Sequence, residues 1–138
     1  EPQAILVRPQ RSALSDYCIQ LTTLTPEMLA EGITFQEACS LLRDEYQSDR
    51  RTWASYGDYD RIAFIKQCDE LNLLYPFGRS HINVKNLLAL HFGLNQEVNL
   101  PQAMALIDLP FEGSLHRGVD DAWNIAAVLS RVLLMRDR

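Results

Sequence analysis

Hydrophobic positions along the chain alternate between short extended runs and longer stretches with helical spacing. The short runs at residues 4–8, 52–56 and 81–84 predict strands, because they are rich in β-branched and aromatic residues and two of them are closed by proline or glycine. Apolar residues spaced three and four apart predict helices over residues 26–32, 35–47, 61–72, 87–92 and 101–106, and from residue 120 onward. This alternation predicts an α/β layered domain.

Two of these helices have recognisable starts. Thr25 is a suitable N-cap residue, and Thr34 together with Glu37 forms the T-x-x-E capping box. The helix after Thr34 is expected to end near Gln47, and residues 48–51 read as its exposed exit loop. In the last helix, the expected buried face consists of Ile125, Val128, Leu129, Val132 and Leu133. The basic residues suited to its C-terminal end are Arg131, Arg136 and Arg138.

Size and composition fit one soluble domain. The chain has 138 residues, 47% of them hydrophobic and 22% charged, which is ordinary for globular proteins. It has no run of roughly 18 apolar residues, so no membrane contact is expected. Cys18, Cys39 and Cys68 are odd in number and far apart, and each lies beside apolar residues. They are interpreted as reduced core thiols of a cytoplasmic protein.

Net charge limits the function classes. A formal charge of −5 argues against a protein whose basic surface simply coats nucleic acid. It leaves open an enzyme that meets phosphates through divalent cations, because carboxylates are then ligands rather than obstacles.

The first candidate site follows the middle strand, at Gly57-Asp58-Tyr59-Asp60. One interpretation is that an aspartate simply caps the helix that follows. The other is that a carboxylate at the carboxyl edge of the sheet binds a metal ion.

The second candidate site begins at His116, in a loop, with Asp121 five residues further on in the first turn of a helix. Asp120 and Asp121 both suit the helix dipole, which would leave His116 a solvated residue. Alternatively, Asp121 binds a divalent cation and His116 acts beside it as a general base, since histidine titrates near neutral pH. His81 and His91 have no comparable neighbours.

At these residues the sequence resembles the DEDDh 3'-5' exonucleases, most closely the branch that holds histone-mRNA exonuclease and the KapD-type bacterial proteins. The matching pieces are V-R-P at 7–9, L-S-D-Y-C at 14–18, L-T-T-L-T at 21–25, G-D-Y-D at 57–60, I-N-V-K at 82–85 and H-R-G-V-D-D-A-W-N-I-A at 116–126. Each piece is short, and their order and spacing together are specific.

The resemblance implies a ribonuclease-H-like, three-layer α/β/α domain with a mixed sheet. It also implies that Asp60 and Asp121 belong to a site for two divalent metal ions, Mg or Mn. His116 would be the base that activates the attacking water. Asp60 fits the family pattern better than Asp58, because an aromatic residue precedes it and an apolar helix follows.

The implied substrate is the 3' end of single-stranded RNA or DNA, and the implied product is a nucleoside monophosphate. Members of this branch stack the terminal base between aromatic and aliphatic side chains, and the matching positions are Tyr17, Leu21 and Tyr59. Ordinary packing is the alternative interpretation of Tyr17 and Leu21, which are four residues apart. Stacking on a single base would give little sequence preference.

One departure from the family is large. The D-x-E motif of its first strand, which supplies two further carboxylates, is absent from this chain. The domain over residues 1–138 is therefore expected to be N-terminally incomplete. We expect roughly 40 to 60 further residues upstream, from typical domain sizes, in preference to completion by another chain. The chain alone is expected to be inactive. The alternatives to an exonuclease are a catalytically inactive interaction module with this fold and a different ribonuclease-H-like nuclease that does not need His116.

Overall fold

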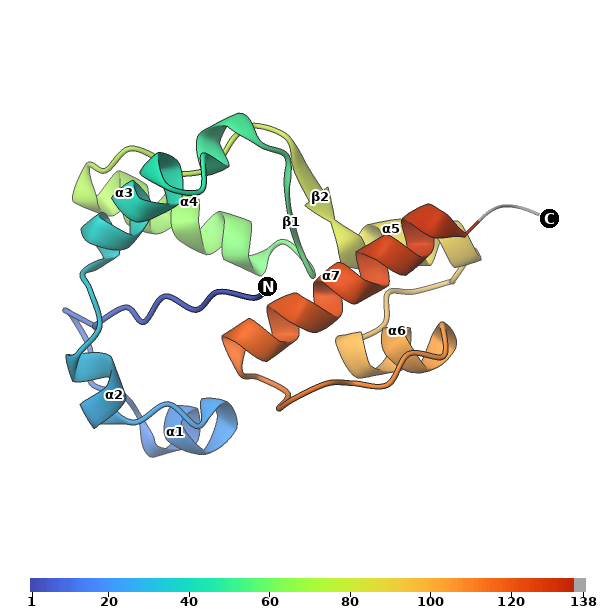
Figure 1. Cartoon of the computed structure of the whole chain (residues 1–138), viewed down its shortest axis with the longest axis horizontal. Coiled ribbons are helices and arrows are strands. Elements are labelled where there is room, and N and C mark those ends of the chain that lie inside the picture. The colour runs from blue at the N-terminus through green and yellow to red at the C-terminus, as the bar shows by residue number, and fades with distance from the viewer. Residues whose placement is uncertain (136–138) are drawn as a thin grey trace.

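The structure is a computed structural model that describes residues 1–135, and its centre is a small parallel sheet (Figure 1). Strands β1 (Trp53–Ser55) and β2 (His81–Asn83) lie side by side in parallel and are connected through helix α4 (Tyr59–Leu71). Ser55 is in register with Asn83, so both strands end at the same edge. Ligands of open α/β sheets bind at that carboxyl edge. The predicted α/β class is confirmed.

Helices cover the sheet from both sides in Figure 1. On one side lie α3 (Phe35–Asp44) and α4, and on the other lie α5 (Val84–Phe92) and α7 (Gly118–Leu134). Helix α7 packs against α5 and α6 (Leu100–Leu106). The remaining elements are α1 (Asp16–Thr22), α2 (Pro26–Ala30) and a 3₁₀ helix η1 (Ser48–Arg50).

The buried apolar side chains form two separate clusters. The larger lies among α5, α6 and α7, and its fully buried members include Val84, Leu88 and Val128. The smaller joins α3 to α4 through Phe35, Cys39 and Cys68, with aromatic rings packed around it. Both cysteines are free and buried, as the sequence predicts, and desolvation raises the pKa of the Cys39 thiol to about 12. The prediction of a core position is wrong for Cys18, which is free but only half-buried on α1 and lies outside both clusters.

Helix caps follow the sequence closely. The Thr25 hydroxyl accepts a hydrogen bond from the Met28 N–H, and α2 begins at the following proline. Thr34 and Glu37 form the complete capping box of α3. The Glu37 carboxylate accepts the Thr34 backbone N–H at 2.8 Å, and this bond lowers the pKa of the Glu37 carboxyl.

The predicted strand over residues 4–8 is wrong. Only Val7 forms a bridge, in parallel with Ile33, through hydrogen bonds of 2.8 Å from Arg8 N–H and 2.9 Å to the carbonyl of Leu6. A regular strand needs a partner that runs alongside it over several residues, and among the described residues only Ile33 pairs with this segment. The contact is close, because a Cβ at Gly32 would lie 2.7 Å from the Leu6 carbonyl oxygen.

Helix α1 has no counterpart among the predicted helices, although Ser15 supplies its N-cap and Asp16 its first-turn carboxylate. Residues 48–50 form η1 where a loop was predicted. Ser48 is buried and its hydroxyl donates to the carbonyl of Pro76, whereas residues 49–51 are exposed as predicted.

The buried face of α7 is narrower than predicted. Val128 and Val132 are buried, whereas the Leu133 side chain is 69% exposed. Arg131 lies in the last turn of the helix, as expected for a basic residue. Arg136 and Arg138 lie outside the described residues.

The chain exposes much more surface than a closed domain of its mass. Its accessible area is 9689 Å². A compact monomer of this mass would expose about 7,300 Å² by the usual scaling of area with mass. The helices therefore leave part of the sheet region uncovered. No helix within residues 1–135 is both long and apolar enough to cross a bilayer.

Candidate active site

A cavity of about 850 Å³ lies between β1 and the first half of α7, and it brings three predicted site residues together. Asp60, His116 and Asp121 all line it. Asp60 comes from the first turn of α4, immediately beyond the carboxyl end of β1. The other two come from the start of α7 and from the loop before it. The remaining wall is apolar and is formed largely by β1 and by one face of α7.

The two aspartates after β1 have different surroundings. Asp58 occupies the N-cap position of α4, yet its side chain makes no capping hydrogen bond. Its carboxylate instead accepts two hydrogen bonds from the Arg61 guanidinium, both 2.8 Å, and this pairing lowers the pKa of Asp58. The capping interpretation of Asp58 is therefore wrong. Asp60 is exposed and lines the cavity.

His116 and Asp121 are connected directly. The His116 backbone N–H donates to the Asp121 Oδ1 at 3.1 Å, across the turn that begins α7. Burial raises the pKa of the Asp121 carboxyl, and this hydrogen bond acts in the opposite direction. His116 itself is exposed and has a φ of 68°, the left-handed region that few non-glycine residues adopt. Its backbone is thus held in an uncommon conformation beside the cavity.

Two further residues hold the loop that carries His116. Asn124 is buried, and its carboxamide bonds both the N–H of Glu112, at 2.9 Å, and the carbonyl of Glu112, at 2.8 Å. The Asp120 carboxylate accepts the Ser114 N–H at 2.9 Å. No role for Asn124 was predicted from the sequence. The available signal was a polar asparagine on the helix face that is expected to be apolar.

The predicted base-stacking residues do not line this cavity. Tyr59 is 82% exposed at the start of α4, and Tyr17 is 70% exposed on α1. Leu21 is half-buried near the other end of α1. Helix α1 is nevertheless fastened close to the site, because Arg117 donates a 2.8 Å hydrogen bond to the Thr23 hydroxyl.

The donor chemistry suits a hard divalent cation. Asp60 and Asp121 offer carboxylate oxygens to one cavity, and Mg²⁺ in proteins is commonly held by one or two carboxylates together with water and substrate phosphates. Within residues 1–135 there is no cluster of three or more side chains that could hold a metal ion by themselves. The pair therefore fits part of a coordination shell that substrate and other ligands would complete.

Solved structures with a similar fold define the class of protein. The nuclease domain of 3'hExo, a DEDDh family member, bound to rAMP, superposes with a TM-score of 0.80 and 26% identity. The match covers 92% of this chain and 68% of that domain. A structure of a 3'-exonuclease that describes 3'-end specific recognition of a histone mRNA stem-loop has a TM-score of 0.78, with 26% identity over 92% of this chain and 47% of that one. The fold is that of a DEDDh exonuclease domain, as the sequence resemblance predicts.

Sequence relatives agree. A model of the exonuclease family RNase_T matches residues 1–129, so the chain belongs to that family, in its histone-mRNA exonuclease-like part. Human 3'-5' exoribonuclease 1 is 28% identical in an alignment that covers 92% of this chain and 39% of the relative. The 3'-5' exonuclease Snipper of Drosophila melanogaster is 24% identical over 87% of this chain and 50% of its own. The chain thus spans half or less of these relatives.

Proposed function

We propose that this chain carries the metal-binding and base residues of a 3'-5' exonuclease that hydrolyses single-stranded RNA or DNA from the 3' end. The observation that supports the proposal most directly is the shared cavity. Two carboxylates and a histidine from separate parts of the sequence, Asp60 and the His116–Asp121 turn, line one space beyond the carboxyl end of β1. Two carboxylates that can hold metal ions, together with a histidine that can accept a proton, suit the metal-assisted hydrolysis of a phosphodiester.

In this mechanism Asp60 and Asp121 would hold divalent cations, Mg or Mn, and we propose two of them, as the family resemblance implies. When bound, such ions stabilise the charge that develops on the phosphate and lower the pKa of water. His116 accepts the proton of the attacking water. Its exposed side chain and fixed backbone suit that task, because the imidazole reaches solvent while the His116 N–H is tied to the carboxylate of Asp121.

The substrate we favour is RNA. The matched structures contain rAMP, a nucleoside monophosphate, or concern a histone mRNA stem-loop. We propose nucleoside monophosphate as the product here too. Tyr17, Leu21 and Tyr59 are proposed to contact the terminal base, because two of them are highly exposed aromatic residues on the elements that flank the site. A cytoplasmic location stays a prediction.

The remaining metal ligands are proposed to come from a D-x-E strand that pairs with the free edge of β1. Residues 53–56 line the cavity along that edge. The opposite wall is the apolar face of α7, formed by Ile125, Ala126 and Leu129. A slot between a strand edge and an apolar helix face suits an added strand, because it satisfies backbone groups on one side and buries side chains on the other.

The test uses the full gene product and a 5'-labelled single-stranded RNA with a free 3' end. With Mg or Mn, we expect a ladder that shortens one nucleotide at a time. EDTA should abolish it, and His116→Ala should slow it by roughly 10²–10⁴-fold, the usual contribution of a general base. Arg131→Ala, at an exposed position in the last turn of α7, is the matched control and should leave the rate unchanged.

Absence of cleavage with either metal, on both RNA and matched DNA, would overturn the proposal. It would favour the non-catalytic interaction module. The observation that fits this alternative is that residues 1–135 contain no cluster of three metal-binding side chains. A ladder that His116→Ala leaves intact would point instead to a nuclease of this fold without a histidine base.

A further inference from the structure

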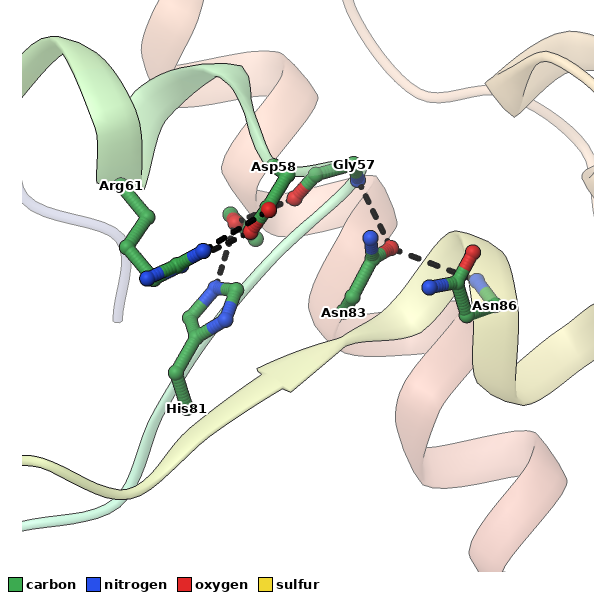
Figure 2. A network of polar contacts seen from close by, with 7 residues as sticks. Gly57, Asp58, Arg61, His81, Asn83 and Asn86 are labelled. Carbon is green, nitrogen blue, oxygen red and sulfur yellow. Dashed lines mark hydrogen bonds and ion pairs between the residues drawn. The ribbon is translucent and has the colours of Figure 1, made fainter.

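The turn between β1 and α4 is anchored at Gly57 through both polar groups of its backbone (Figure 2). The Gly57 N–H donates to the Asn83 Oδ1 at 3.1 Å. The Gly57 carbonyl accepts the Ser55 hydroxyl at 2.8 Å. Gly57 has a φ of 96°, a conformation that glycine adopts without strain. The two peptide groups on either side of the Gly57 Cα are thus each held by a side chain, which leaves this turn little freedom to rotate.

His81 fixes the direction of the Ser55 hydroxyl. The Ser55 Oγ lies 2.8 Å from the His81 Nε2. Because the single hydroxyl proton is used on the Gly57 carbonyl, Ser55 must accept at this contact and His81 must donate. The imidazole therefore carries a proton on Nε2. Ser55 is buried, whereas Gly57 and His81 at either end of this chain of hydrogen bonds are partly exposed.

Asn83 connects the turn to two other elements. It is the last residue of β2 and the N-cap of α5, where its Oδ1 also accepts the Asn86 N–H at 3.3 Å. Figure 2 shows both bonds converging on this one oxygen. Asn83 is also the register partner of Ser55. One pair of facing residues, at the ends of two neighbouring strands, thus holds the two peptide groups that flank the Gly57 Cα.

We propose that Asn83 and Ser55 are positioning residues for Asp60. They fix the peptide at which the chain leaves the sheet, and the next residues begin α4 and direct the Asp60 carboxylate to the cavity. Asp58 does not line the cavity, and its carboxylate is paired with the Arg61 guanidinium (Figure 2). This inference rests on the proposed function for the role of Asp60 and concerns how that side chain is oriented.

The decisive variant is Asn83→Ser in the full gene product. Serine is as good an N-cap as asparagine, so α5 keeps its cap, but the shorter side chain loses the reach to Gly57. We expect Mn²⁺ affinity, measured by calorimetry, to fall roughly 10–100-fold, as when other outer groups of metal sites are removed. Asn83→Asp retains the acceptor oxygen and should retain most of the affinity.

A second readout does not depend on metal. Hydrogen exchange of the Gly57 amide should become about tenfold faster in Asn83→Ser, because one hydrogen bond is lost. Ser55→Ala removes the hydrogen bond to the Gly57 carbonyl and should also weaken Mn²⁺ binding. Thr34→Ala is the matched control. It removes the N-cap of α3, and should change neither Mn²⁺ affinity nor exchange at Gly57 if those effects need more than a general loss of helix stability.

The outcomes separate the two proposals. Unchanged Gly57 exchange in Asn83→Ser, or Mn²⁺ affinity equal to that of the wild type, would overturn the positioning role. Loss of Mn²⁺ affinity in Asn83→Ser, but not in Thr34→Ala, supports it whether or not RNA is cleaved. If the wild type cleaves no RNA, the proposed function fails, and the exchange comparison still decides whether Asn83 holds the turn.

Discussion

Asp58 and Asp60 show how neighbouring carboxylates acquire different tasks. The guanidinium of Arg61 binds Asp58 with two hydrogen bonds, whereas Asp60 faces the cavity. We therefore predict that Asp60→Asn reduces exonuclease activity by more than the roughly 10–100-fold cost of losing an outer group of a metal site. Asp58→Asn should reduce activity less. RNA ladders from the two variants under identical conditions measure this, and the assignment fails if only Asp58→Asn is inactive.

Asn124 is a single side chain that holds the loop before α7. Its replacement by alanine leaves the N–H and carbonyl of Glu112 without their side-chain partner. Each unpaired group costs about 1–3 kcal/mol when it stays away from water. Both Glu112 groups are only partly buried, so we predict that Asn124→Ala lowers the free energy of unfolding by about 2 kcal/mol in urea titrations. Ser130→Ala, at an exposed position of the same helix, should change it by less than about 0.5 kcal/mol. Equal effects of the two variants would contradict this role of Asn124.

Residue-level prediction from sequence succeeded where neighbours in sequence are neighbours in space. His116 and Asp121, predicted to share a site, line the same cavity because only one turn of chain separates them. Asn83 was not singled out, since its bond to Gly57 spans 26 positions and depends on the register of two strands. The pairing of Asp58 with Arg61 was missed for another reason, because an aspartate before a helix is most often a cap.

At the scale of elements, the capping box gives a prediction about pH. The pKa of Glu37 is lowered by the hydrogen bonds from Thr34. A carboxyl whose pKa is lower in the folded protein stabilises it above the unfolded value, about 4.5. That contribution disappears as the pH falls through the lowered folded value. Glu37→Gln should therefore flatten the pH dependence of unfolding below about pH 5, as measured by thermal melts from pH 3 to 7. Glutamine keeps the box at neutral pH, so a large loss of stability there would contradict the argument.

Elements were predictable to the extent that their signals are local. Caps and helix-breaking glycines placed α2, α3 and α5 within a few residues. The run at residues 4–8 has strand composition, but a strand needs a partner, and Val7 finds only Ile33. Leu133 shows that a helix is subject to the same limit. Helical spacing identifies an apolar stripe, but it does not tell how much of that stripe a neighbouring element covers.

At the scale of the molecule, the excess surface predicts incomplete folding. An accessible area of 9689 Å² leaves the apolar wall of α7 and the edge of β1 uncovered. We predict that residues 1–138 expressed alone melt without a cooperative transition and cleave no RNA, whereas the full gene product melts cooperatively and cleaves RNA. Calorimetry and the ladder assay check this. A monomeric, cooperatively melting sample of these residues alone would contradict it.

The two separate hydrophobic clusters have a consequence for how the protein loses function on heating. Asp60 stands on α4, which belongs to the smaller cluster, whereas His116 and Asp121 stand at the start of α7, which belongs to the larger. Within residues 1–135, strands of three residues join the two sides at the centre. Regions of different local stability open locally at different free energies, so in the proposed exonuclease the weaker side would set the upper temperature for catalysis. Local opening there would separate Asp60 from His116 and Asp121 below the cooperative transition, and inactivation would then precede the loss of helical signal.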